Sequence, residues 1–113
     1  MHEMSIALNI IDIVSEEALR AEARSINSIE IEIGSISGVE ISALELALEA
    51  AVKGSSLERT QIKIIPIQAT ARCTECNSTY TLTTLYEPCP TCSSLKFHLV
   101  RGKELQIKSI NVA

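Results

Sequence analysis

Four cysteines carry the clearest chemical signal in this sequence. They form two pairs, Cys73-Thr-Glu-Cys76 and Cys89-Pro-Thr-Cys92, with 12 residues between the pairs. Two intervening residues let the backbone turn beneath a metal ion, so that both thiolates of a pair point at the same place. Two such turns joined by a hairpin would give a tetrahedral cage of four sulfur atoms, which Zn²⁺ accepts. The spacing therefore predicts a structural zinc site formed by Cys73, Cys76, Cys89 and Cys92.

Iron, a redox-active dithiol pair and disulfides are the alternatives for these cysteines. A catalytic zinc is disfavoured because it needs an open coordination position. A dithiol oxidoreductase needs an exposed thiolate with a lowered pKa, and a four-cysteine cage would leave none free. Disulfides are rare in the cytosol, where we place the chain. It shows no basic, apolar leader and no apolar run long enough to span a bilayer, so we expect no membrane partner.

The first three residues form a second group that could bind a metal. An initiator Met is normally trimmed only before a small residue, so Met1 should stay in front of His2. The Met1 amine, the His2 backbone nitrogen and the His2 imidazole could then chelate one ion, with Glu3 adding a carboxylate or amide nitrogen. Such a nitrogen-rich plane suits Ni²⁺ or Cu²⁺ better than Zn²⁺. From the residues alone, a solvated terminus is the plainer interpretation, and His98, expected to be exposed on a strand, is a weaker ligand candidate still.

Hydrophobic periodicity predicts the first helix and the first strand. Apolar residues at helical spacing indicate a helix from Ser5 to about Ala23. The alternation of Ile29, Ile31 and Ile33 with glutamates indicates a strand with one buried face.

A second helix should follow, beginning with a capping box at Ser42-Ala-Leu-Glu45. Ile41 and Leu46 could form its hydrophobic staple, and Gly54 is placed to end it.

In two later strands the apolar residues move from one face of the strand to the other midway, which predicts a β-bulge in each. The first changes at Pro66, after Ile62 and Ile64, and the second between Ile107 and Ile110. The strands around Ile31, Ile64 and Ile107 should form one sheet. We therefore expect an α+β fold: a small three-stranded sheet covered by two helices, with an inserted four-cysteine zinc-ribbon module. The predicted domains are residues 1–70 plus 100–113 for the α/β part and residues 71–99 for the ribbon.

Charge disfavours a nucleic-acid partner. The net charge is −4, and between Arg72 and Arg101 three basic residues stand against two acidic ones. Proteins that grip phosphate backbones depend on clustered Lys and Arg. We can assemble no Ser/His/Asp set around the two His residues of the chain, and we find no phosphate-binding Gly loop. We therefore do not expect an enzyme.

Several motifs together resemble one known family. The opening Met-His-Glu-Met-Ser-Ile-Ala, the turn Gly34-Ser-Ile-Ser-Gly-Val39 and the CxxC…CPxC ribbon are similar to the HypA/HybF family of hydrogenase nickel-incorporation proteins. The likeness continues through Leu44-Glu-Leu-Ala-Leu-Glu49 to the ending Gly102-Lys-Glu-Leu…Lys108-Ser-Ile110, so it covers essentially the whole chain.

This resemblance implies a cytoplasmic nickel metallochaperone rather than an enzyme. It implies that Ni²⁺ is a transferable cargo bound by Met1, His2 and Glu3, with His2 as the essential ligand, and that Zn²⁺ is structural. It also implies two partners, a HypB-like nickel-insertion GTPase and the large subunit of [NiFe]-hydrogenase. The resemblance leaves open whether the protein is a monomer or a homodimer, and whether a hydrogenase or urease receives the nickel.

Overall fold

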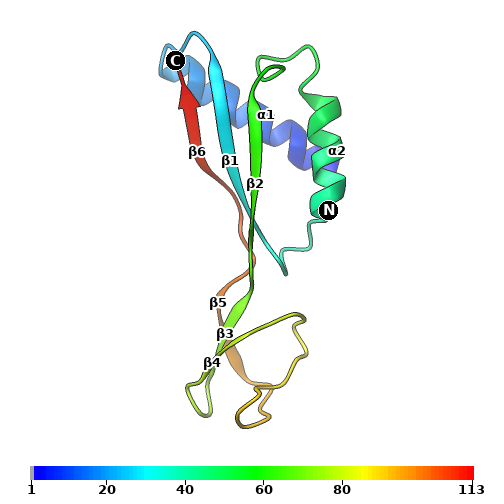
Figure 1. Ribbon diagram of the computed structural model, residues 1–113, viewed down its shortest axis with the longest axis vertical. Helices are drawn as coiled ribbons and strands as arrows, with labels where there is room; N and C mark the ends of the chain where they lie inside the picture. Colours follow the sequence, from blue (N-terminus) through cyan, green and yellow to red (C-terminus); the bar gives the residue numbers. More distant parts are fainter. Residues whose placement is uncertain (1) are drawn as a thin grey trace.

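The computed structural model describes residues 2–113, and Figure 1 shows two modules arranged end to end. Over these residues the chain forms two helices and six strands: α1 (Glu3–Arg20), β1 (Ile26–Gly34), α2 (Ile41–Ala51), β2 (Gln61–Ile67), β3 (Thr70–Cys73), β4 (Thr79–Thr81), β5 (Phe97–Arg101) and β6 (Leu105–Val112). The strands make two three-stranded sheets, ordered β2-β1-β6 and β4-β3-β5. The α+β fold with an inserted ribbon is therefore confirmed.

The larger module is built on β1, the central strand of its sheet. Strand β1 pairs in parallel with β2 and antiparallel with β6, so that Ile31 lies opposite both Ile64 and Ile107, as predicted. The alternating Ile29, Ile31 and Ile33 are fully buried. Both helices cover the same face of this sheet (Figure 1), and their apolar residues join the three isoleucines in one core.

Helix α1 begins and ends earlier than the sequence indicated. Its last turn ends at Arg20, because Glu22 adopts a positive φ of 53°. The amide of Ala23 then donates to the carbonyl of Ala18, and the amide of Glu22 donates to that of Leu19. This pair of bonds is the Schellman motif, which usually has glycine at the left-handed position. With Glu there instead, the stop signal is hard to read from sequence.

The predicted capping box of the second helix is wrong. Helix α2 begins at Ile41, with Glu40 at the N-cap and no side-chain capping bond. Ser42 lies inside the first turn, and its hydroxyl donates to the Glu40 carboxylate over 3.1 Å. The hydrophobic staple is also absent, since Leu46 is 68% exposed. Gly54 does have the expected positive φ, of 77°, two residues beyond the end cap Val52.

One of the two predicted β-bulges is present. In β6, Ser109 pairs with Glu30 and Ile107 pairs with Ile31, so Lys108 is the extra residue. This bulge brings Ile107 and Ile110 to the same core face.

Strand β2 contains no bulge, because its register with β1 is continuous. Ile62 and Ile64 pack against the larger core, whereas Ile65 lies beside Glu32 on the other face. The chain then enters the ribbon, where Ala69 is fully buried. The change of face therefore marks the passage from one core to the other.

Backbone hydrogen bonds join the two modules at the turn that follows β1. The amide of Ser35 donates to the carbonyl of Ile67 (2.8 Å), and the amide of Ile36 donates to that of Gly102 (2.9 Å). The Ser35 hydroxyl accepts from the amide of Ala69 (2.9 Å), and Ile36 packs against the ribbon core. One short turn thus contacts both segments that connect the modules.

Two glycines make this contact sterically feasible. A Cβ atom on Gly34 would lie 1.9 Å from the carbonyl oxygen of Gly102. Gly102 has a φ of 131°, and a Cβ there would lie 2.4 Å from the Cβ of Ala69. At either position an added Cβ would collide with main-chain atoms of the facing segment, so the junction needs both glycines.

We therefore expect Gly34→Ala to lower the free energy of unfolding by about 3 kcal/mol or more, because main-chain atoms would have to move. Gly54→Ala is the matched control, since its Cβ would meet no atom within 4 Å and only the φ of 77° is unfavourable. In that variant the free energy of unfolding should fall by only about 1 kcal/mol. Urea titrations at a fixed metal concentration measure both, and equal losses would contradict the account of the junction.

Candidate metal centres

The two cysteine pairs lie in turns with the same backbone design. In the first, the amide of Cys73 donates to the carbonyl of Ser78, and the amide of Asn77 donates back to the carbonyl of Cys73. In the second, the amide of Cys89 donates to the carbonyl of Ser94, and the amide of Ser93 donates to the carbonyl of Cys89. Asn77 and Ser93 occupy equivalent positions, with φ values of 63° and 64°. Each turn therefore closes beneath its pair of thiols, as the CxxC spacing predicted.

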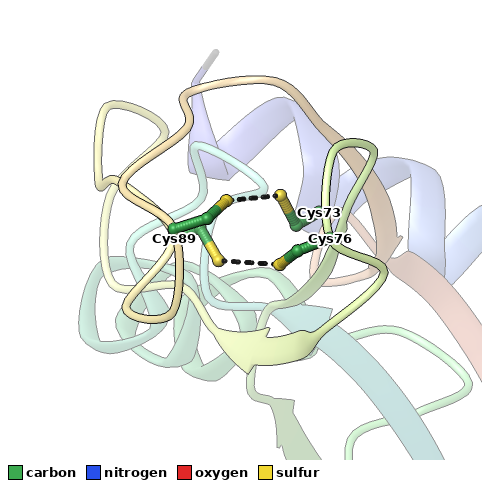
Figure 2. Close-up of side chains that lie close together, drawn as sticks. Cys73, Cys76 and Cys89 are labelled. Carbon is green, nitrogen blue, oxygen red and sulfur yellow. Dashed lines mark hydrogen bonds between the residues drawn. The ribbon is translucent and has the colours of Figure 1, made fainter.

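The four sulfur atoms converge on one point. The Sγ atoms of Cys73 and Cys92 are 3.5 Å apart, those of Cys76 and Cys89 are 3.7 Å apart, and all four lie within 4.8 Å of one another. Figure 2 shows the labelled side chains pointing towards each other from opposite turns. A Zn–S bond of about 2.3 Å corresponds to S–S edges of about 3.8 Å in a tetrahedron. The arrangement thus fits one tetrahedral metal ion.

Disulfides do not fit the same geometry. All four cysteines are free, and both short S–S separations, 3.5 and 3.7 Å, are far longer than a covalent bond of about 2.05 Å. The disulfide alternative is therefore wrong, and the cysteines are positioned to bind a metal.

Neighbouring groups shift the thiol pKa values in opposite directions. The Ser78 hydroxyl lies 3.3 Å from the Sγ of Cys76, and its hydrogen bond lowers the pKa of Cys76 to about 6. For Cys92, the amide of Ser94 favours the thiolate, but the hydrogen bond to Cys73, burial and the other sulfurs outweigh it and raise the pKa to about 12. Four thiolates repel one another, so a cation is needed to balance all four.

The cysteines also form part of the ribbon's small core. Six residues are buried there, and two of them are metal ligands: Ala69, Ala71, Cys73, Tyr80, Leu82 and Cys89. The Tyr80 hydroxyl is buried and has no hydrogen-bond partner among the residues that the structure describes, and burial raises its pKa. Leu85 and Leu95 do not join this core, since they are 42% and 62% exposed. Such a small core makes the metal important for the fold of the ribbon.

Two of the three amino-terminal candidates can be placed. Met1 lies outside the described residues. His2 is exposed with extended backbone at the N-cap of α1, and its carbonyl accepts from the amide of Ile6 over 3.3 Å. Glu3 starts the helix, and its carboxylate accepts from the amide of Glu40 over 3.4 Å. No local pattern singles out Glu40, because this contact joins the beginnings of two helices 37 residues apart.

The position of His2 leaves nitrogen donors accessible. The first amides of a helix have no intrahelical carbonyl partner, so the backbone nitrogens of His2 and Glu3 can serve as ligands without breaking a helical bond. His98 is exposed on β5, beside Arg72, as predicted. Within residues 2–113 it belongs to no cluster of metal-binding side chains.

The fold and the cysteine site define a small two-module metalloprotein with a four-cysteine ribbon. The family model for hydrogenase/urease nickel incorporation metallochaperones, HypA, matches residues 1–112. The chain therefore belongs to the HypA family.

Individual relatives agree with this assignment. The hydrogenase maturation factor HypA of Parabacteroides distasonis is 43% identical over 110 residues, covering 97% of this chain and 96% of that protein. The factor of Geotalea daltonii is 37% identical and covers 99% of both chains. The solution structure of the Ni metallochaperone HypA from Helicobacter pylori has a TM-score of 0.68 at 23% identity, covers 99% of this chain and 97% of that one, and supports the fold.

Neither helix within residues 2–113 combines the length and apolar character needed to cross a membrane.

Cys73→Ala should release the metal, because it removes one of the four donors, and should loosen the ribbon while leaving the larger module folded. Amide hydrogen exchange would then accelerate in β3, β4 and β5 but not in β1. Thr91→Ala, an exposed change inside the second CxxC turn, is the control and should retain the metal. Full metal occupancy in the Cys73 variant would contradict the four-cysteine site.

Proposed function

We propose that this protein binds Ni²⁺ at its amino terminus and delivers it during hydrogenase maturation. Membership of the HypA family carries the proposal, and the exposure of His2 at the start of α1 supports it. The ligands are the Met1 amine, the backbone nitrogen and imidazole of His2, and a donor from Glu3. A nitrogen-rich plane of this kind favours Ni²⁺.

The structural arrangement suits a metal that has to be given away. An exposed terminal site lets a partner approach the ion and replace its ligands one at a time. The hydrogen bond from the Glu40 amide holds the Glu3 carboxylate at the edge of α2, which limits how far the terminus has to be ordered on binding. The site is therefore accessible but partly organised in advance.

The ribbon holds Zn²⁺ in a structural role, through Cys73, Cys76, Cys89 and Cys92. Four thiolates leave no open coordination position, so this ion has no vacant site for catalysis. Soft sulfur donors hold the zinc and nitrogen donors hold the nickel, which keeps the two metals on different sites.

The delivery requires two partners, which we take to be a HypB-like GTPase and the large subunit of [NiFe]-hydrogenase in the cytosol. The protein itself acts as a carrier rather than an enzyme. The family description also includes urease. Cells that lack this protein would show which of the two enzymes, hydrogenase or urease, becomes deficient in nickel.

Replacing His2 with Ala should abolish nickel binding and leave zinc in place, because the two sites use different donors. His98→Ala is the matched control, since it removes the second imidazole of the chain from an exposed strand. Calorimetric nickel titration of untagged protein, with zinc measured by elemental analysis, gives both results. Wild-type nickel affinity in the His2 variant would overturn the proposed site.

A short extension before Met1 should have the same effect as the His2 substitution. It converts the terminal amine into an amide and so removes one of the proposed ligands. Cells that carry the extended protein should make hydrogenase deficient in nickel, with activity partly restored by excess nickel salt. Normal nickel content in that hydrogenase would show that the amine is not needed.

A further inference from the structure

A groove of about 530 Å³ lies between α2 and β2. Its floor is formed by four apolar residues, Leu48, Val52, Ile62 and Ile64, with the polar Thr60 beside them. Its rim carries three carboxylates, from Glu45, Glu49 and Glu58. None of these residues belongs to either metal centre, so the α2–β2 groove is a separate feature of the surface.

The rim carboxylates of the α2–β2 groove are exposed and uncompensated. Glu45 and Glu49 are one helical turn apart and so share a face of α2. Within residues 2–113, the ion pairs are Arg20–Glu17 and Lys96–Glu75, so no rim carboxylate has a salt bridge. The three also do not converge as a metal-binding cluster in this part of the chain. Their charge is therefore available to a partner with basic side chains.

Strand β2 offers a second means of binding beside the same groove. It is the outermost strand of its sheet, paired with β1 on one side only. Within residues 2–113 the backbone groups of its other edge have no strand partner, and such an edge can accept an added strand. Pro66 has no amide hydrogen and would limit the pairing at the far end, beyond Ile64. The basic residue of β2, Lys63, lies on the opposite face of the sheet, in register with Glu30.

We propose that the α2–β2 groove binds an extended basic segment of a partner protein, added as a strand along the free edge of β2. Alternate Lys or Arg residues of that segment face the groove. Their aliphatic stems cover Ile62 and Ile64, and their charged heads reach the rim carboxylates. The aliphatic stems of such a segment match the apolar residues of the floor, its charged heads match the acidic rim, and its backbone matches the free edge of β2. The proposal does not depend on nickel binding.

The test is an NMR titration of the zinc-loaded, full-length protein with a short synthetic peptide in which Lys alternates with Thr. Chemical-shift changes should centre on residues 45–52 and 58–64, and the amides of β2 should exchange more slowly. A peptide with Glu in place of Lys should not bind. Methylating alternate backbone nitrogens of the Lys peptide should abolish binding, because strand pairing needs those amides.

Charge reversal separates the groove from general attraction to an acidic protein. The Glu45→Lys, Glu49→Lys variant should bind the Lys peptide about tenfold or more weakly. The control is Asp12→Lys, Glu16→Lys, which changes two exposed carboxylates at the same spacing on α1. Equal weakening by both variants, shifts mapped elsewhere, unchanged binding by the methylated peptide, or occupation of the groove by a second copy of this chain would each overturn the proposal.

Discussion

Coordination by four thiolates substitutes for a hydrophobic core in the ribbon module. Only six buried residues gather there, and Cys73 and Cys89 are two of them. A module of this size cannot bury enough apolar surface to offset its loss of conformational entropy. A metal ion would supply much of the missing free energy, since it alone balances four thiolates held within 4.8 Å of one another. We therefore expect the ribbon module, at the bottom of Figure 1, to depend on a bound metal ion for its shape.

The two proposed metal sites differ in the features that decide whether an ion stays or leaves. The cysteines come from two turns closed by backbone hydrogen bonds, and Cys73 and Cys89 are almost completely buried. The terminal site instead begins with the exposed His2, ahead of the first helical hydrogen bond. A closed cage of four soft donors, two of them buried, retains its metal, whereas an exposed terminus can exchange ligands with a partner. Under this proposal, one small chain holds one metal and carries another.

The sequence predicted those features that depend on strong local patterns. Alternation at Ile29, Ile31 and Ile33 identified the buried strand, and the CxxC spacing identified the cage. Both follow from the period of the backbone or the geometry of a metal, and neither needs long-range information. The sheet around Ile31 followed from the same alternation.

The errors arose where tertiary contacts decide local structure. The capping motif at Ser42 failed because α2 starts two residues earlier, with Glu40 in place of Ser42 as its N-cap. The change of face in β2 came from the passage of the chain between two cores, which no local pattern distinguishes from a bulge. The contact between Glu3 and Glu40 depends on how two distant helix ends meet. The role proposed for His2 came from the resemblance to a family, because composition and spacing could not supply it.

X-ray absorption at the nickel edge tests the central claim most directly, because it reports the donor atoms of the bound ion. Untagged protein loaded with one nickel per chain should show only nitrogen and oxygen neighbours in a planar arrangement, with the outer-shell scattering of a single imidazole. The zinc edge of the same sample should show sulfur neighbours at about 2.3 Å. Sulfur in the nickel spectrum would mean that the cargo occupies the cysteine cage, and it would contradict the division into a retained and a transferable metal.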